Sequence, residues 1–530
     1  MRFPSYSYKN LFKKNKTIIL CFILFFLSRI FFINAGGVFF DSDEYLHLFS
    51  LSNFLQAIVM GHAPPHEGYI LLFWPIYHLS QFFHANAAYA VILVQIILSF
   101  FTLLFFYYSI KYIIDKKTAL YTAIIASLIP LFWIINVTLM MENAYVFFFF
   151  LSLFLLTKFL TTKKNYILHA SLLFYSLALL TQTLIILWAP LYLYIIFLKE
   201  KTKLRKVIIL LSLYVILFSF LNIFFVASGG NSPPQKTFYY LYLSKSGEFA
   251  EIQFNFKGLL ISLRNFIIPL LKNNTAFIII LTFVSLIVAL LKDKKIFLFG
   301  LLFIAPALYT TQWWDSLLNG RHALIASFGI AFLTAYLISR KNIIYFLLII
   351  GYLLFVSLPA LSLLNKPIPY IQEAQFAATI PKDGLFIESH FARPQVQATV
   401  KSKTIYINEP RWNQQPLANI INVYLKKREP VFISSAALSE PYGLYSGPYL
   451  HNITLSYAYP FILDQVLTNY TIVPYKIINK NDNLLIYKIT TIKKHPYPTI
   501  KNMRNSYRRL DYADPFWQAT WWVETTLLHQ

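Results

Sequence analysis

The sequence contains few charged residues, few glycines and a single cysteine. Charged residues make up 13% of the 530, about half of their usual share in soluble domains. The lone thiol, Cys21, excludes an internal disulfide and a cysteine-based zinc cluster. Only 15 glycines accompany 51 phenylalanines and 37 tyrosines, which excludes collagen-like and disordered chains. With 57% hydrophobic residues, the composition is typical of a protein whose solvent is largely lipid.

Eleven apolar runs have a length suited to crossing a hydrocarbon core, which is about 30 Å thick. We expect the run 69–83, which is interrupted by His78 and Gln81, to be a re-entrant or interfacial helix instead. The eleven predicted spans are residues 17–35, 88–110, 118–137, 143–160, 166–181, 183–198, 207–227, 276–291, 296–312, 322–339 and 343–362.

Acidic residues are scarce, and the basic residues that outnumber them are unevenly placed. The chain has 46 Lys and Arg against 22 Asp and Glu, a formal net charge of +24. Lysine and arginine concentrate in every second connection between the predicted spans, which is the pattern of cytoplasmic loops. We therefore expect an integral protein of the plasma membrane, with a cytoplasmic N-terminus and with residues from 363 onward outside. The charge is a signal of topology, so its partner is a lipid bilayer and not nucleic acid.

The composition changes after residue 362. Short β-like runs occur at 384–389, 403–408, 431–435 and 484–489, and an amphipathic helix is expected at 415–428. This order predicts a small extracytoplasmic α/β domain over 363–530, ending in an aromatic and basic tail. The expected fold is thus a polytopic α-helical membrane domain, 1–362, followed by that domain. External loops at 36–87 and 228–275 belong to the membrane domain.

Three carboxylates open the first of these external loops. Asp41, Asp43 and Glu44 lie within the segment FFDSDEY, and such close acids are costly to bury without partners. Such a cluster binds a cation, acts as a base that takes a proton from a nucleophile, or pairs with Arg29 in the first span. A solvated loop start, with Asp41 as a helix N-cap, explains the same residues.

Two further candidate sites follow in the same loop and after the third predicted span. His66 and Glu67 come directly after a Pro-Pro pair and form a candidate site for a divalent metal ion. Adjacent ligands of this kind also arise by chance. Glu142 is the acid nearest the next short external turn and begins an apolar helix. There it serves catalysis or simply stabilises the helix N-terminus.

The last candidate site precedes the tenth predicted span. Arg321 is the lone cation of its external loop and is followed by His322. A guanidinium in this position suits a phosphate oxygen, which it binds through two parallel hydrogen bonds. The alternative is an arginine that extends to the lipid headgroups.

These motifs, in this order, resemble the GT-C superfamily of integral-membrane glycosyltransferases. The likeness is greatest to the branch that contains protein O-mannosyltransferases and lipid A aminoarabinose transferases, and it extends from residue 17 to about residue 340. It rests on Arg29, on the Asp43–Glu44 pair, on Pro64–Pro65, on Glu142 and on Arg321–His322. The block LLFYSLALLTQTLIILWAPLYLY is also similar to the fifth and sixth helices of that family.

The resemblance implies a function and a set of roles. The donor would be a sugar on a polyprenyl phosphate, and the transfer to an acceptor hydroxyl would invert the anomeric carbon on the external face. Asp43 would be the catalytic carboxylate, with Glu44 beside it and Glu142 as a second acid. Arg321 would hold the donor phosphate, and the other candidate substrate contacts are Arg29, Asp41, His66 and His322. No cofactor is certain; a divalent metal ion held by His66 and Glu67 is the one candidate.

Other classes of membrane protein compete with this interpretation. A transporter or flippase places polar residues near the bilayer midplane, often in repeated halves, whereas the middle spans here carry almost no charge. An O-antigen-ligase-type enzyme would place its key residues in a late external loop, whereas the informative acids here come early. The acids gather at one predicted face, which favours chemistry over passage.

Overall fold

The structure, a computed structural model, describes residues 20–21, 23–33, 51, 66–229, 256, 274–310, 324–362, 369–389, 402–407, 417–434, 470–479 and 484–492. These residues belong to two compact units. The first ends at Ser362 and the second begins at Pro369.

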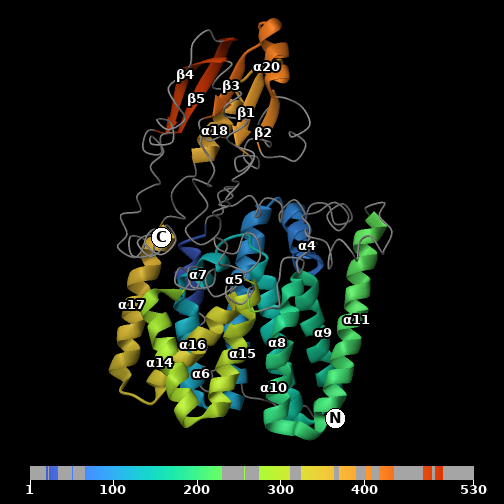
Figure 1. The fold of residues 1–530 in the computed structure, drawn as a ribbon, viewed down its shortest axis with the longest axis vertical. Helices are drawn as coiled ribbons and strands as arrows, with labels where there is room; N and C mark the ends of the chain where they lie inside the picture. Colours follow the sequence, from blue (N-terminus) through green and yellow to red (C-terminus); the bar gives the residue numbers. More distant parts are fainter. Residues whose placement is uncertain are drawn as a thin grey trace. The chain divides into compact units, whose positions relative to one another are not determined.

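The first unit is helical (Figure 1). Its helices form over long apolar runs, and several of them begin at capping side chains. Asn86 accepts the backbone N–H of Tyr89 at 3.3 Å, and Asp115 accepts that of Thr118 at 2.8 Å. The helices are α4 (Glu67–Phe82), α5 (Ala87–Ile113), α6 (Lys116–Leu128), α7 (Pro130–Asn136), α8 (Glu142–Thr162), α9 (Asn165–Thr181), α10 (Ala189–Glu200), α11 (Leu204–Gly229), α14 (Ala276–Lys292), α15 (Lys294–Thr310), α16 (Leu324–Ser339) and α17 (Ile343–Ser362), with 3-10 turns η1 (Thr183–Trp188) and η2 (Lys201–Lys203).

Several of these helices are long and apolar enough to span a bilayer. Within the described residues, three stretches qualify by length and composition: Ala87–Ile113, Glu142–Thr162 and Thr183–Leu221. A fourth qualifies if the bent pair α6 and α7 is one span, and shorter apolar helices accompany them. The helices lie where the sequence predicts apolar runs, but the total of eleven spans stays a prediction.

The predicted span 118–137 is the clearest departure from a straight helix. It consists of α6 and α7, which are bent by 66° at Ile129–Pro130. Proline has no backbone N–H and disfavours helical backbone in the residue before it. The bend therefore follows from one residue inside an otherwise apolar run.

The second unit contains a mixed five-stranded sheet, in the order β2-β1-β3-β5-β4. Strand β1 pairs in parallel with β2 and β3, and β5 pairs antiparallel with β3 and β4. The elements are α18 (Pro369–Ala377), β1 (Leu385–Ser389), β2 (Lys403–Ile407), α20 (Leu417–Lys426), β3 (Val431–Ser434), β4 (Tyr470–Asn479) and β5 (Leu484–Ile492).

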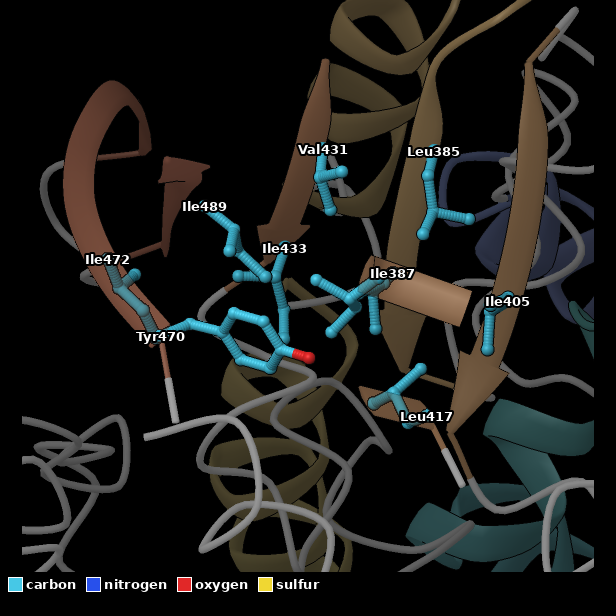
Figure 2. Close-up of a cluster of buried hydrophobic side chains, with 10 residues drawn as sticks. Leu385, Ile387, Ile405, Leu417, Val431, Ile433, Tyr470, Ile472 and Ile489 are labelled. Carbon is cyan, nitrogen blue, oxygen red and sulfur yellow. The ribbon is translucent and has the colours of Figure 1, made fainter. Parts of the chain in front are cut away.

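Helices cover both faces of this sheet. On one face, Ile387 and Ile433 of neighbouring strands join a buried cluster that includes Ile421 of α20 (Figure 2 shows the strand residues of this cluster). On the other face, the ring of Phe376 from α18 lies 5.6 Å from that of Phe432. Alternate residues of each strand therefore contribute to two cores, as the two-residue repeat of a strand requires.

Candidate active site

Three predicted site residues lie at one end of the helical unit. Helices α8 and α9 are joined by a two-residue turn at Lys163–Lys164 and run side by side in opposite directions. The start of α8, Glu142, and the end of α9, Thr181, therefore share an end. The imidazole Nδ1 of His66 lies 2.9 Å from the carbonyl oxygen of Thr181, which brings His66 and Glu67 to the same end. Figure 1 shows α4 and α7 in this part of the unit.

His66 and Glu67 are fixed against the end of α9. Both side chains are buried. Since a carbonyl oxygen only accepts, Nδ1 of His66 carries the proton, and Nε2 is the nitrogen with the lone pair in the neutral ring. Gly68 permits this contact, because a Cβ there would lie 2.1 Å from Oγ1 of Thr181 and 2.6 Å from the carbonyl oxygen of Leu177. A glycine at the start of α4 is thus a requirement of the packing.

Glu142 is buried at the N-terminus of α8, directly after a buried turn over residues 137–141. Buried turns are rare because their backbone groups need partners, and here one amide side chain bonds to the turn and another to the end of α7 before it. Gln95 Nε2 donates to the Met140 carbonyl at 3.0 Å, and Asn143 Nδ2 donates to the Ile135 carbonyl at 2.6 Å. The hydroxyl of Ser99 lies 2.9 Å from Asn143 Oδ1 and completes the network. The carboxylate of Glu142 therefore projects from a rigid base.

Arg29 stabilises the bend between α6 and α7. Its guanidinium lies between two aromatic rings, with Cζ 3.9 Å from the Phe25 centroid and 4.4 Å from the Trp133 centroid. Nη2 donates to the carbonyl of Ser127, which has lost its helical partner at the bend. The next carbonyl, that of Leu128, accepts a hydrogen bond from Ser357 Oγ of α17 at 2.8 Å. In lipid every backbone polar group needs such a partner, so these side chains make the broken helix tolerable.

The remaining predicted site residues lie outside the described residues: Asp41, Asp43, Glu44, Arg321 and His322. Their assignments stay predictions. Among the described residues, no group of three or more His, Cys, Asp or Glu side chains is arranged to hold a metal ion. His66 and Glu67 would therefore need ligands from elsewhere in the chain or from the substrate.

The basic turns gather at the opposite end of the unit. Lys163 pairs with Glu200, and Lys206 Nζ donates to Asn165 Oδ1 at 3.1 Å. Lys199 Nζ lies 5.3 Å from the ring centroid of Tyr112. These contacts join three lysine-rich connections that are far apart in the sequence. The end that carries Glu142 and His66 is separated from them by the length of the helices.

Sequence analysis did not single out several polar residues that organise this end. Gln95, Ser99, Asn143 and Ser357 are buried and hydrogen-bonded to backbone or to one another. A search for charged residues in the spans passes over them. The usable signals were the amide side chains within apolar runs and Pro130, which interrupts the helix.

Part of the chain matches a known protein family. The family described as dolichyl-phosphate-mannose-protein mannosyltransferase matches residues 64–225. No curated protein matches the sequence. Among solved structures, the chain is similar to ArnT from Cupriavidus metallidurans bound to undecaprenyl phosphate, with 8% identity, a TM-score of 0.54, and coverage of 90% of this chain and 98% of that one.

A second structural likeness is to the archaeal oligosaccharyltransferase AglB from Archaeoglobus fulgidus, in complex with an inhibitory peptide and a dolichol-phosphate. The identity is 10% and the TM-score 0.53, over 88% of this chain and 73% of that chain. At such identities the likeness is one of fold. The family match covers residues 64–225, and the structural likenesses show a shared fold.

Proposed function

We propose that this protein transfers a sugar from a polyprenyl-phosphate donor to an acceptor hydroxyl at the external face of the plasma membrane. The observation that carries the proposal is the family match over 64–225. This segment contains His66, Glu67 and Glu142, which lie at one end of the unit. The lipid phosphates named with the two similar structures support the class of donor.

The surface of the helical unit suits a donor that arrives through lipid. Large apolar side chains project from its helices, such as Leu291 at 79% and Phe355 at 74% exposure. A polyprenyl chain is insoluble in water and must reach the enzyme within the bilayer. The charged phosphate then lies near the edge of the bilayer. The buried acids and polar side chains at one end of the helical unit would lie at the same level.

The reaction needs a base at the acceptor and charge stabilisation at the leaving group. Asp43 takes the proton of the acceptor hydroxyl, with Glu44 beside it and Glu142 as a second acid. The acceptor oxygen forms a bond to the anomeric carbon from the side opposite the phosphate. The bond from that carbon to the phosphate oxygen breaks, and polyprenyl phosphate leaves with the electron pair.

Cationic and polar groups complete the proposed site. Arg321 holds the phosphate, which leaves as an anion and needs little protonation. Asp41, His66, His322 and Arg29 are the further substrate contacts, and His66 with Glu67 would contribute ligands to a divalent metal ion. Mannose is the first sugar to test, because the matching family is described by it. The transporter or flippase alternative is not favoured by the family match or by the fold.

Release of polyprenyl phosphate from sugar-loaded lipid tests the proposal. Purified protein is incubated with several polyprenyl-phosphate sugars, and products are measured by mass spectrometry. Asp43→Asn should abolish release. The matched control is Asp115→Asn, which lies at the lysine-rich end, where asparagine caps α6 as well as aspartate does. Full turnover by Asp43→Asn would contradict the catalytic assignment.

A further inference from the structure

Two buried side chains of α7 carry polar atoms that have no hydrogen-bond partner among the described residues. They are Nε1 of Trp133 and both amide atoms, Oδ1 and Nδ2, of Asn136. Trp133 is 2% exposed and Asn136 is fully buried. The two residues are three positions apart, so they are neighbours on one side of the helix.

Two comparable side chains of the unit, Asn143 and Trp188, are satisfied. Asn143 is also buried, and its amide donates to the Ile135 carbonyl and accepts from Ser99. Trp188 is as buried as Trp133, and its Nε1 donates to the Phe303 carbonyl at 3.0 Å. The unmet groups of α7 therefore do not reflect loose packing of the whole unit. Adjacent buried groups of this kind are costly and call for a ligand or bound water.

The hydrogen-bond donors and acceptors among these unpartnered groups determine which kind of ligand can bind. The indole N–H and the amide NH₂ are donors, and Nε of Arg29, next to the Trp133 ring, is a third group without a partner among the described residues. Oδ1 of Asn136 is an acceptor. A phosphate has only acceptor oxygens at neutral pH and would leave Oδ1 unmet. Hydroxyl groups donate and accept, so they satisfy the whole set.

We propose that Trp133 and Asn136 bind hydroxyl groups of the sugar carried by the lipid donor. The inference rests on the proposed function and adds a sugar-binding site that lies apart from the phosphate contacts. Helix α7 is suited to this role because the 66° bend directs it away from α6, and because the turn that follows leads to Glu142. Arg29 stabilises the bend through Nη2 and adds Nε to the donors of the proposed site.

The proposal predicts an unusual relation between stability and binding. Truncating Asn143 breaks two hydrogen bonds, one to the Ile135 carbonyl and one from the Ser99 hydroxyl. Truncating Asn136 breaks no side-chain hydrogen bond among the residues that the structure describes. Asn136→Ala should therefore lower the Tm of the free protein much less than Asn143→Ala does. Trp133→Phe keeps an aromatic ring against Arg29 and removes only the N–H, with Trp188→Phe as its control.

The test is the shift in Tm of the purified full-length protein caused by two lipids, polyprenyl phosphate and the same lipid carrying the sugar. A ligand that binds the folded state raises Tm. Wild type should respond more to the sugar-carrying lipid. Asn136→Ala and Trp133→Phe should keep the response to polyprenyl phosphate and lose the additional response to the sugar. Affinity for the sugar-carrying lipid should fall by about tenfold for each hydrogen bond lost.

The outcomes separate this inference from the function on which it rests. If wild type responds to neither lipid, the proposed function fails. If wild type responds and Asn136→Ala keeps the additional response to the sugar, the sugar site alone is overturned. If Asn136→Ala lost both responses equally, Asn136 would contact the phosphate, and the sugar site would again be overturned. If the Tm of free Asn136→Ala fell as far as that of free Asn143→Ala, the Asn136 amide would have a structural role. That result would overturn the proposal.

Discussion

Removal of one hydroxyl group at the bend between α6 and α7 should destabilise the protein measurably. Ser357 Oγ donates to the Leu128 carbonyl at 2.8 Å. In Ser357→Ala this carbonyl is left without a partner in an apolar setting, because the helix supplies no N–H at the bend. An unsatisfied buried polar group costs about 1–3 kcal/mol. We expect the free energy of unfolding to fall by about 2 kcal/mol, within that range.

Ser285 is a matched control on α14. Its Oγ donates to the Leu333 carbonyl at 2.6 Å, and it is equally buried. The Leu333 carbonyl lies inside α16, where a backbone N–H one turn later also bonds to it. Ser285→Ala thus removes one hydrogen bond and leaves no unmet carbonyl, so it should cost about 0.5–1 kcal/mol.

Equilibrium unfolding of both variants in mixed detergent micelles measures the difference. The cavity left by each substitution is the same, so the comparison isolates the polar contribution. Equal losses for Ser357→Ala and Ser285→Ala would refute the reasoning that the bend depends on donated side-chain hydrogen bonds. A larger loss for Ser285→Ala would refute it as well.

Three further predictions follow from individual positions. Gly68→Ala places a Cβ against Thr181 and should cost about 1–3 kcal/mol, seen as a lower Tm, whereas Gly351→Ala, with open space around it, should not. Ile387→Ala in the sheet core should cost about 2–5 kcal/mol in urea unfolding of the second unit. Burial raises the pKa of Tyr470 to about 12, above a value of about 10 in the unfolded chain. Its contribution to stability is therefore present below pH 10 and is lost as the pH rises to about 12; unfolding measured at pH 9 and 11 should show a smaller loss for Tyr470→Phe than for wild type.

The placement of most elements was predictable because their signals are local. Apolar runs mark the helices of the first unit, and β-branched runs mark β1, β2, β3 and β5 in the second. The strand β4 was not predicted, and it contains Pro474, a residue type that argues against a central strand. It lies at the edge of the sheet, where a missing N–H is tolerated. Edge position is a property of the folded sheet and cannot be read from the run itself.

The site was predictable in part, for a related reason. Charged residues and histidines are conspicuous in apolar sequence, so Arg29, His66, Glu67 and Glu142 could be chosen as candidates, and all four are buried in the structure. The bend at Pro130 and its partner Ser357 were not, because the two are 227 positions apart (357 − 130) in the sequence. Whether a buried amide is satisfied, as in Asn143, or not, as in Asn136, depends on which backbone groups the fold brings to it.

Photocrosslinking with a diazirine-bearing polyprenyl phosphate tests the central claim most directly. The claim is that the lipid donor is used at the end of the helical unit that carries His66 and Glu142. Peptide mapping should find the label around the start of α4, along α7 and at the start of α8. Labelling concentrated at the lysine-rich turns around Lys163 and Lys199, or in the sheet of the second unit, would contradict the account.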